Sequence, residues 1–365
     1  YTTLGMATDQ GKIANIPGLA ILADISGKTI AETGTTIFRP PYTPVPIAAF
    51  AGRSRGKDFR PTRITPSHKW ASAEGAVFVE TGAWLRAQWY SKTGETEWRQ
   101  SVDREVLATR ASVGICDVTT LGKIDIQGCD AAAFLNHVYA NGFAKLPIGR
   151  TRYGLMLRED GIVMDDGTTA RLGETHYVMT TTTANAVSVF RHLEFCRQCL
   201  WPELDVQLIS ITEQYAQYAV AGPNARCLLE KLIDFGEDIS NEAFPFMACG
   251  EISICGGVKA RLFRISFSGE LAFEIAVPSR YGDAMIRALM AAGEEFGVTP
   301  YGTEAIGVMR IKKGHVAGNE LNGQTTALQM GLGRMVSQSK DSIGFVLSRR
   351  PELIRDDNYE LIGLK

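Results

Sequence analysis

The segment Leu157-Arg158-Glu159-Asp160-Gly161-Ile162-Val163-Met164-Asp165-Asp166-Gly167 places an apolar run directly before two adjacent carboxylates. In an extended segment adjacent side chains point to opposite faces, so Asp165 and Asp166 need not share a proton, which argues against an aspartic-protease dyad. Asp166 falls in step with Ile162 and Met164, which we expect to face the core. A carboxylate on that face is costly unless it has a partner, a cavity or a cationic ligand. Asp166 is therefore the first candidate functional residue.

Two other interpretations of this segment are open. Asp-Asp-Gly is also ordinary turn chemistry, so residues 165–167 could close a turn that has no function. A calcium-binding loop is disfavoured, because Ile162-Val163-Met164 supplies no side-chain oxygens.

Two further side chains stand out on either side of this segment. A strand is predicted to begin at Tyr153, a side chain that core packing would explain equally well. Residues 264–277 alternate with a period of two, which predicts a strand with Glu274 between Ala272 and Ala276 on one face. The small neighbours leave a hollow with a carboxylate at its floor, which suits a ring that bears N–H donors. The alternative is a solvent-facing glutamate on a half-exposed strand.

A weak internal repeat surrounds these candidates. Residues 124–131 and 218–225 each read as a strand, a glycine turn and a helix cap, with Asp130 as the first cap and Asn224 as the second. Residues 177–183 are rich in β-branched side chains and predict another strand, followed by an amphipathic helix. Two related strand–turn–helix modules predict a duplicated α+β domain, although such segments also arise by chance.

The first part of the chain is predicted to be the end of a different unit. A short helical run at residues 19–24 precedes Phe38-Arg39-Pro40-Pro41-Tyr42-Thr43-Pro44-Val45-Pro46, whose prolines exclude a helix and favour a stiff, extended linker. A second unit is expected to start near Pro66. The chain has no initiator methionine, and residues 360–365 read as a strand without its partner, so we expect a fragment at both ends.

The composition is that of an ordinary globular protein. The chain has 365 residues, of which 45% are apolar and 21% charged, enough for a sizeable core. A net charge of -2 gives no reason to expect nucleic acid as a partner, and no apolar run reaches the roughly 18 residues of a membrane helix. The seven cysteines are interpreted as reduced thiols of a cytoplasmic protein, and those of Cys196-Arg197-Gln198-Cys199 as buried helix residues rather than metal ligands or a redox pair. The five histidines form no metal-binding or triad motif, so no metal is expected.

Three motifs resemble the glycine-cleavage T-protein (aminomethyltransferase) family. They are Gly161-Ile162-Val163-Met164-Asp165-Asp166, Arg264-Ile265-Ser266-Phe267-Ser268-Gly269-Glu270-Leu271-Ala272-Phe273-Glu274 and Ser112-Val113-Gly114-Ile115-Cys116-Asp117-Val118. The resemblance runs from near residue 65 to the C-terminus. It implies the α+β folate-binding fold of that family, with duplicated strand–helix modules, and tetrahydrofolate as the ligand.

A second resemblance covers the whole chain. Residues 1–12, the proline-rich linker and residues 179–186 are similar to the family of α subunits of heterotetrameric sarcosine oxidases. This implies that residues 1–46 are the tail of a dinucleotide-binding domain with its linker, residues 47–344 the folate-binding domain, and residues 345–365 the start of a truncated β-barrel. It also implies NAD, FAD and FMN in the complete enzyme, and the β, γ and δ subunits as partners.

The first resemblance carries roles to particular residues. Asp166 corresponds to the carboxylate near the reacting nitrogens of folate, and Glu274 to the residue that holds the pterin. Tyr153 matches an aromatic side chain that lines the site, and Asp165 is expected to bind the cofactor beside them.

Three positions depart from the family pattern. Phe267 stands where the family has a tyrosine, and Thr182 where it often has an asparagine; both are still expected in the binding site. Ile306 aligns with an arginine that elsewhere meets the folate tail or the substrate. Contacts to the folate tail and to a lipoyl-borne aminomethyl group are therefore not expected, which fits a subunit that receives a small imine.

The function implied is transfer of the methylene carbon of oxidised sarcosine to tetrahydrofolate, giving 5,10-methylenetetrahydrofolate and glycine. One alternative is the equivalent subunit of another N-methyl amino acid oxidase or dehydrogenase, for example one that acts on N-methylglutamate. The other is a folate-binding or assembly module that has lost catalysis.

Overall fold

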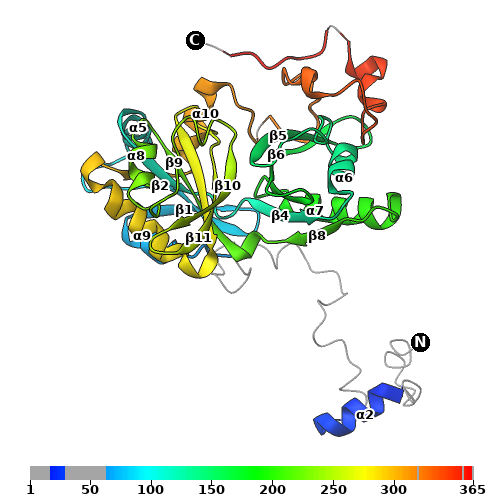
Figure 1. Cartoon of the computed structure of the whole chain (residues 1–365), viewed down its shortest axis with the longest axis horizontal. Helices are drawn as coiled ribbons and strands as arrows, with labels where there is room; N and C mark the ends of the chain where they lie inside the picture. The colour runs from blue at the N-terminus through cyan, green and yellow to red at the C-terminus, as the bar shows by residue number, and fades with distance from the viewer. Residues whose placement is uncertain (1–16, 29–62, 319, 356, 364–365) are drawn as a thin grey trace. The chain divides into compact units, whose positions relative to one another are not determined.

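The computed structural model of the chain describes residues 17–28, 63–318, 320–355 and 357–363 (Figure 1). The chain divides into two units, Tyr1–Pro61 and Thr62–Lys365. In the first unit, helix α2 (Pro17–Ser26) contains the helical run predicted at residues 19–24. The proline-rich linker and the boundary expected after residue 46 lie outside the described residues.

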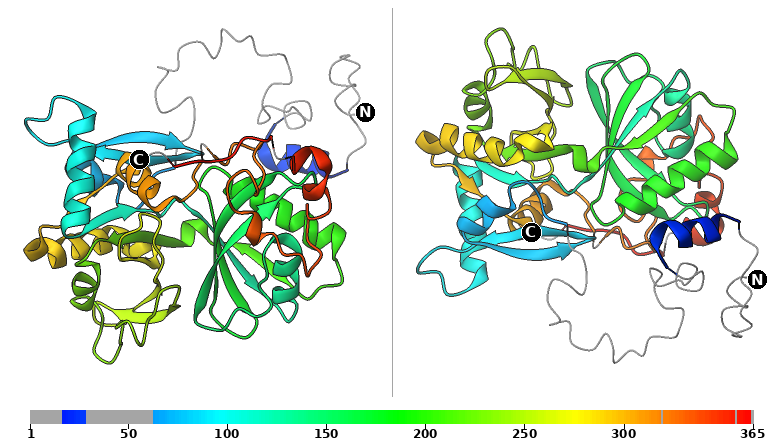
Figure 2. Two further views of the ribbon diagram at one scale, coloured as in Figure 1. Left: turned by 90° about the horizontal axis from the view of Figure 1, so that it is seen from above. Right: turned by 90° about the horizontal axis from the view of Figure 1, so that it is seen from below.

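Two large sheets lie side by side in the second unit (Figures 1 and 2). One has the strand order β5-β6-β7-β4-β8, with all neighbours antiparallel. The other has the order β10-β11-β12-β9-β3-β13, in which β13 pairs parallel with β3. The five-stranded sheet consists of β4 (Gly122–Gln127), β5 (Arg150–Leu157), β6 (Val163–Arg171), β7 (His176–Thr181) and β8 (Gln207–Ser210). The six-stranded sheet consists of β3 (Gly114–Asp117), β9 (Tyr215–Ala221), β10 (Cys249–Ile254), β11 (Val258–Phe263), β12 (Ala272–Pro278) and β13 (Thr299–Pro300).

Helices and a hairpin complete this unit and give each sheet a core. The hairpin is β1 (Ala76–Thr81) with β2 (Trp84–Tyr90), and the helices are α4 (His68–Ala73), α5 (Trp98–Ala111), α6 (Ala131–Val138), α7 (Ala186–Phe195), α8 (Ala225–Glu230), α9 (Gly282–Gly293) and α10 (Thr303–Lys313). Buried side chains of α6 and α7 pack with β4 and β7, and those of α8 and α9 pack with β9 and β12. The α+β class expected from the sequence is confirmed.

The two predicted strand–turn–helix modules are formed, one in each large sheet. Strand β4 leads through Gly128 into α6, and β9 leads through Gly222 into α8. Asp130 and Asn224 occupy the N-cap positions of α6 and α8 as expected, but neither makes a side-chain capping bond. Asp130 instead accepts a hydrogen bond from the backbone N–H of Asp205, which ties the turn to a neighbouring loop.

The segment of residues 157–167 is a hairpin between β5 and β6. The turn lies at residues 158–161, where Gly161 has a φ of 86° and the Asp160 carboxylate accepts the N–H of Ile162 at 3.1 Å. Residues 165–167 lie inside β6, so the alternative that they form a turn is wrong. A β-bulge after Met156 pairs Leu157 with Val163 and Met156 with Asp165. The alternation of β6 is interrupted there, so the expectation that Asp166 shares a face with Ile162 and Met164 is wrong.

Three other expectations need correction. The strand predicted at residues 264–277 begins only at Ala272, and residues 264–271 form a loop that contributes to the cavity described below. The strand expected at the C-terminus is not formed by its described residues, 360–363. Cys196 is buried as expected of a core helix residue, but Cys199 is exposed.

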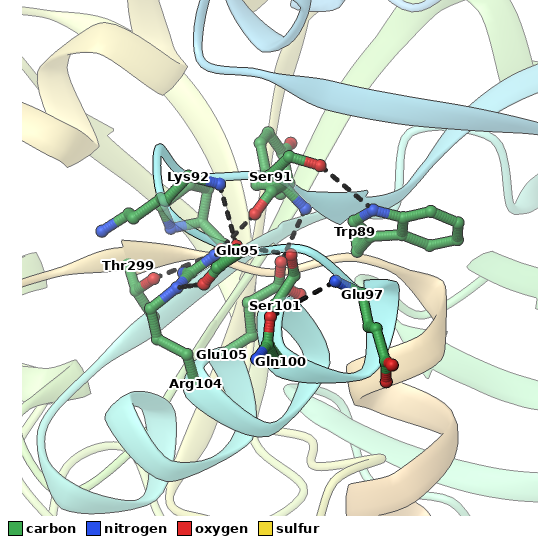
Figure 3. A network of polar contacts seen from close by, with 12 residues as sticks. Trp89, Ser91, Lys92, Glu95, Glu97, Gln100, Ser101, Arg104, Glu105 and Thr299 are labelled. Atoms are coloured by element: carbon green, nitrogen blue, oxygen red, sulfur yellow. Dashed lines mark hydrogen bonds and ion pairs between the residues drawn. The ribbon is translucent and has the colours of Figure 1, made fainter.

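Helix α5 is tied to its neighbours by the acidic side chains of Glu95 and Glu105, as Figure 3 shows. Glu105 is fully buried and accepts the backbone N–H groups of Tyr90 at 2.6 Å and Gly302 at 2.9 Å. Glu95 forms an ion pair with Arg104 at 2.7 Å. Burial raises the pKa of Glu105 to about 7, although both N–H groups oppose the rise. This helix therefore fixes β2 and the start of α10, and both contribute residues to the second cavity described below.

Candidate active site

Two adjoining cavities lie where the two large sheets face each other. The first has a volume of about 440 Å³ and the second of about 620 Å³. Strands β5, β6 and β7 contribute one wall of the first cavity, and β12 with the loop before it contributes another. The residues that line both cavities are Leu121, Asp166, Thr182, Ile265, Phe267, Glu274 and Val316. The cavities therefore meet at two carboxylates that come from different sheets.

Asp166 lies in β6 and is 9% exposed. The hydroxyl of Tyr153, from the neighbouring strand β5, donates to its Oδ2 at 2.7 Å. Burial raises the pKa of Asp166, while the Tyr153 hydroxyl and His315 oppose that rise. Strand β6 can approach β7 here because Gly167 follows Asp166: a Cβ at this position would lie 1.9 Å from the carbonyl oxygen of Thr180.

Asp165 has a different set of partners, as the alternation argument predicts. Its carboxylate accepts the Thr182 hydroxyl at 2.7 Å and the Asn185 side-chain amide at 3.0 Å. Burial raises its pKa to about 7, against these hydrogen bonds. Asp165 lines neither cavity, so the geometry does not support the expected direct contact with a ligand. Its position supports a different role, which is to hold Thr182, a residue that lines both cavities, in place.

Glu274 lies in β12 and lines both cavities, so the solvent-facing alternative is wrong. The side-chain amide of Gln217 donates to its Oε2. Burial raises the pKa of Glu274, and Gln217, Lys123 and Arg86 oppose the rise. Lys123 is almost fully buried and donates to the carbonyl oxygen of Thr119 at 2.7 Å. The result is a carboxylate at the floor of a hollow, able to accept N–H donors from a ring.

His315 is a site residue that the sequence patterns did not reveal. It follows Gly314, whose φ of 75° ends α10, and it lines the first cavity. Its ring lies 5.2 Å from that of Tyr153 and 4.6 Å from that of Phe267. Its Nδ1 contacts the carbonyl oxygen of Val316 at 3.0 Å, and burial lowers its pKa, opposed by that contact and by Asp166. No motif includes this histidine, because its partners come from distant elements.

The remaining sequence candidates also lie at the cavities. Phe267 and Thr182 line both of them, and Ile306 lines the second. Within residues 17–28, 63–318, 320–355 and 357–363, no cluster of histidine, cysteine or acidic side chains could hold a metal ion. In the same described residues, no helix is long and apolar enough to cross a membrane.

The chain belongs to the family described as the GCVT N-terminal domain, which matches residues 67–340. An aminomethyltransferase of Geobacillus sp. (strain WCH70) is 32% identical over 269 residues, which covers 73% of this chain and 69% of that protein. In structure, the aminomethyltransferase T of the glycine cleavage system from Bartonella henselae aligns with a TM-score of 0.66 and 24% identity, over 78% of this chain and 73% of that one. These matches confirm the fold that the motifs implied.

The first residues match a second family, described as the sarcosine oxidase A3 domain, over residues 1–53. The sarcosine oxidase subunit alpha of Rhizobium meliloti (strain 1021) is 54% identical over 366 residues and 100% of this chain. The subunit from Corynebacterium sp. (strain P-1) is 46% identical over the same length. The chain spans 37% and 38% of the length of these two relatives. The resemblance to that family of subunits is thus confirmed.

Proposed function

We propose that this chain is the folate-binding part of a sarcosine oxidase α subunit, and that it transfers the methylene carbon of oxidised sarcosine to tetrahydrofolate. The products are 5,10-methylenetetrahydrofolate and glycine. The observation that carries the proposal is that Asp166 and Glu274, from different sheets, face the same pair of cavities. A flavin- and NAD-dependent oxidation by the rest of the enzyme, with its β, γ and δ subunits, would supply the imine.

The cavity fits the proposed ligand in three respects. Glu274 offers a buried carboxylate to the N–H groups of a pterin ring, and such pairs are strong in a dry site. Phe267 and Ile265 provide apolar surface for the ring faces. Asp166 would then stand beside the reacting nitrogens, with Tyr153 fixing its orientation.

The proton balance of the reaction explains why a carboxylate suits the position of Asp166. One folate nitrogen would attack the methylene carbon of the iminium, and the C=N electron pair would move to the amine nitrogen. The C–N bond to glycine would then break as the second folate nitrogen bonds to the same carbon. The two folate nitrogens lose two protons and the departing glycine nitrogen gains two, so no net proton is released. Asp166 can accept a proton from one nitrogen and deliver it to the other, since its pKa is raised by burial.

The same carboxylate stabilises charge. The iminium and the N-alkylated intermediate are both cationic, and a fixed anion in a water-poor cavity stabilises them without reorganisation. Holding both reactants in adjoining cavities adds the benefit of proximity. His315 lies against Tyr153, which bonds Asp166, and its charge would favour the ionised form of that carboxylate.

The proposed domain boundaries follow the same reasoning. Residues 1–46 would be the tail of a dinucleotide-binding domain with its linker, residues 47–344 the folate-binding domain, and residues 345–365 the start of a β-barrel. The match of residues 67–340 to the GCVT family and of residues 1–53 to the A3 domain supports this division.

Substitution of Asp166 tests the function in the complete enzyme. We expect Asp166→Ala to lower 5,10-methylenetetrahydrofolate formation roughly 100-fold or more while sarcosine oxidation continues, because the charge and the proton carrier are lost. The measurement is the ratio of 5,10-methylenetetrahydrofolate to formaldehyde, which forms when water intercepts the imine. Asp103→Ala, an exposed change on α5, serves as the control. An unchanged product ratio in Asp166→Ala would contradict the assigned role.

A further inference from the structure

The second cavity contains a cation that the proposed folate contacts do not use. Arg86 lies in β2 and lines this cavity together with Thr81, Tyr301, Thr303 and apolar residues of β9 and α10. It does not line the first cavity. Any group that Arg86 binds would therefore occupy the second cavity.

Arg86 has no bonded partner within the described part of the chain. No hydrogen bond or ion pair involves its guanidinium, and its Nε is buried without an acceptor. The Nε of Arg310 in the same cavity also has no acceptor, but the Arg310 guanidinium is paired through its Nη1, whereas the Arg86 guanidinium loses hydration without a partner in the described residues. The N–H groups of the Arg86 guanidinium are therefore available to bind an anion.

Arg310, the other arginine of this cavity, is already engaged. It pairs with Glu320 at 2.9 Å and donates to the carbonyl oxygen of His315 at 3.0 Å. Its charge is therefore compensated within the chain. Ile306, on the same helix, contributes only apolar surface. Arg86 is left as the guanidinium of this cavity that can take up a ligand anion.

The charges of the second cavity are complementary to a zwitterion. Arg86 presents a cation, whereas Asp166 and Glu274 present carboxylates to the same space. A planar guanidinium binds a carboxylate through two parallel N–H donors, and a carboxylate in turn attracts an ammonium or iminium nitrogen. A small α-amino acid carries both groups a few bonds apart.

We infer that Arg86 is the carboxylate-binding residue for the amino-acid part of the imine and for the departing glycine, with their nitrogen directed toward Asp166. This inference rests on the proposed function and assigns the second cavity to the amine and the first to the pterin. It makes Arg86 a specificity-determining residue that favours imines derived from α-amino acids over simple amine imines. The carboxylates of the folate tail are the other anions that Arg86 could bind in the same way.

Calorimetric titration of glycine into the 365-residue chain, with and without tetrahydrofolate, tests this assignment. We expect Arg86→Met to weaken glycine binding roughly tenfold or more and Arg86→Lys to restore part of it, because a charged hydrogen-bonded pair is lost and then partly replaced. Methylamine, which has no carboxylate, should bind the Met variant as it binds the wild-type chain. Arg99→Met, an exposed change on α5, is the control for loss of a positive charge.

Three results would overturn the inference. They are no glycine binding by the wild-type chain, equal glycine affinity in the wild type and Arg86→Met, or an equal loss of methylamine affinity. If Arg86→Met instead weakens tetrahydrofolate but not a tetrahydropterin without the glutamate tail, the anion is that of folate and the amino-acid assignment is wrong. If tetrahydrofolate does not bind at all, the proposed function fails, and the titration without it still tests Arg86.

Discussion

At the scale of single residues, the two adjacent aspartates serve different purposes although the sequence presents them as a pair. Asp166 faces the cavities and pairs with Tyr153, whereas Asp165 is enclosed by Thr182 and Asn185. Alternation along a strand was sufficient to separate them. It did not correctly predict the neighbours of Asp166, because the bulge at Met164 shifts the pairing of β6 with β5.

The pKa of Asp165 leads to a prediction about stability and pH. Its folded-state value of about 7 lies above the ordinary 3.8, so the folded chain holds a proton that the unfolded chain has already lost. This contribution to stability is complete below about pH 4 and disappears as the pH rises through about 7. Asp165→Asn imitates the protonated acid, so its melting temperature relative to wild type should rise between about pH 4 and about pH 7 and then level off. A difference that stays constant over this interval would show that Asp165 is already ionised in the folded protein.

The residues that surround the two carboxylates mark the limit of inference from sequence. Phe267 and Glu274 could be named in advance because they belong to a motif, and Tyr153 because it matches an aromatic position of the family. His315 and Arg86 could not be, since each comes from a segment without a motif and is brought to the cavities only by folding. What marks His315 and Arg86 as functional is their position beside the other site residues in the folded chain, and the order of residues in the sequence does not show this.

At the scale of elements, periodicity predicted the strands that lie within the two sheets and failed where the chain leaves them. Residues 264–271 alternate like the strand that follows, yet they form a loop. Ile265 is buried and Phe267 half-buried where they line the cavities. An alternation of apolar side chains in a loop looks the same in sequence as one in a strand. The helices were easier to place, because α6 and α7 bury one apolar face against a sheet.

Helix α5 gives a prediction at this scale. Glu105→Ala would leave the N–H groups of Tyr90 and Gly302 without their acceptor in a buried position. We expect a loss of about 2–4 kcal/mol in the free energy of unfolding, measured in urea. Asp103→Ala on the exposed side of the same helix should change it little. Equal effects of the two substitutions would mean that Glu105 does not fix the hairpin and α10.

At the scale of the whole second unit, the site depends on how the two large sheets face each other. Arg261 of β11 lies 3.7 Å from Asp125 of β4, and both side chains are nearly buried. Asp125 also contacts His176 of β7 at 2.8 Å, and the Arg261 guanidinium lies 4.6 Å from the ring of Tyr215. This cluster connects the sheets at a place outside both cavities. The sequence predicted the duplicated modules but not this connection, which joins distant strands.

Arg261→Met tests the connection between the sheets. Removing the guanidinium leaves the buried Asp125 with fewer partners, so we expect a loss of about 2 kcal/mol in the free energy of unfolding. Arg287→Met removes an exposed arginine that pairs with Asp283 within α9 and should have little effect. If both variants unfold at the same urea concentration, the cluster does not hold the sheets together.

Calorimetric titration of the chain with tetrahydrofolate tests directly whether the two cavities bind folate. We expect one molecule to bind the wild-type chain, because the two cavities meet at a single pair of carboxylates. We expect Glu274→Ala to weaken that binding roughly tenfold or more, since the acceptor for the ring N–H groups is lost. Absence of binding by the wild type, or an unchanged dissociation constant in Glu274→Ala, would contradict these expectations.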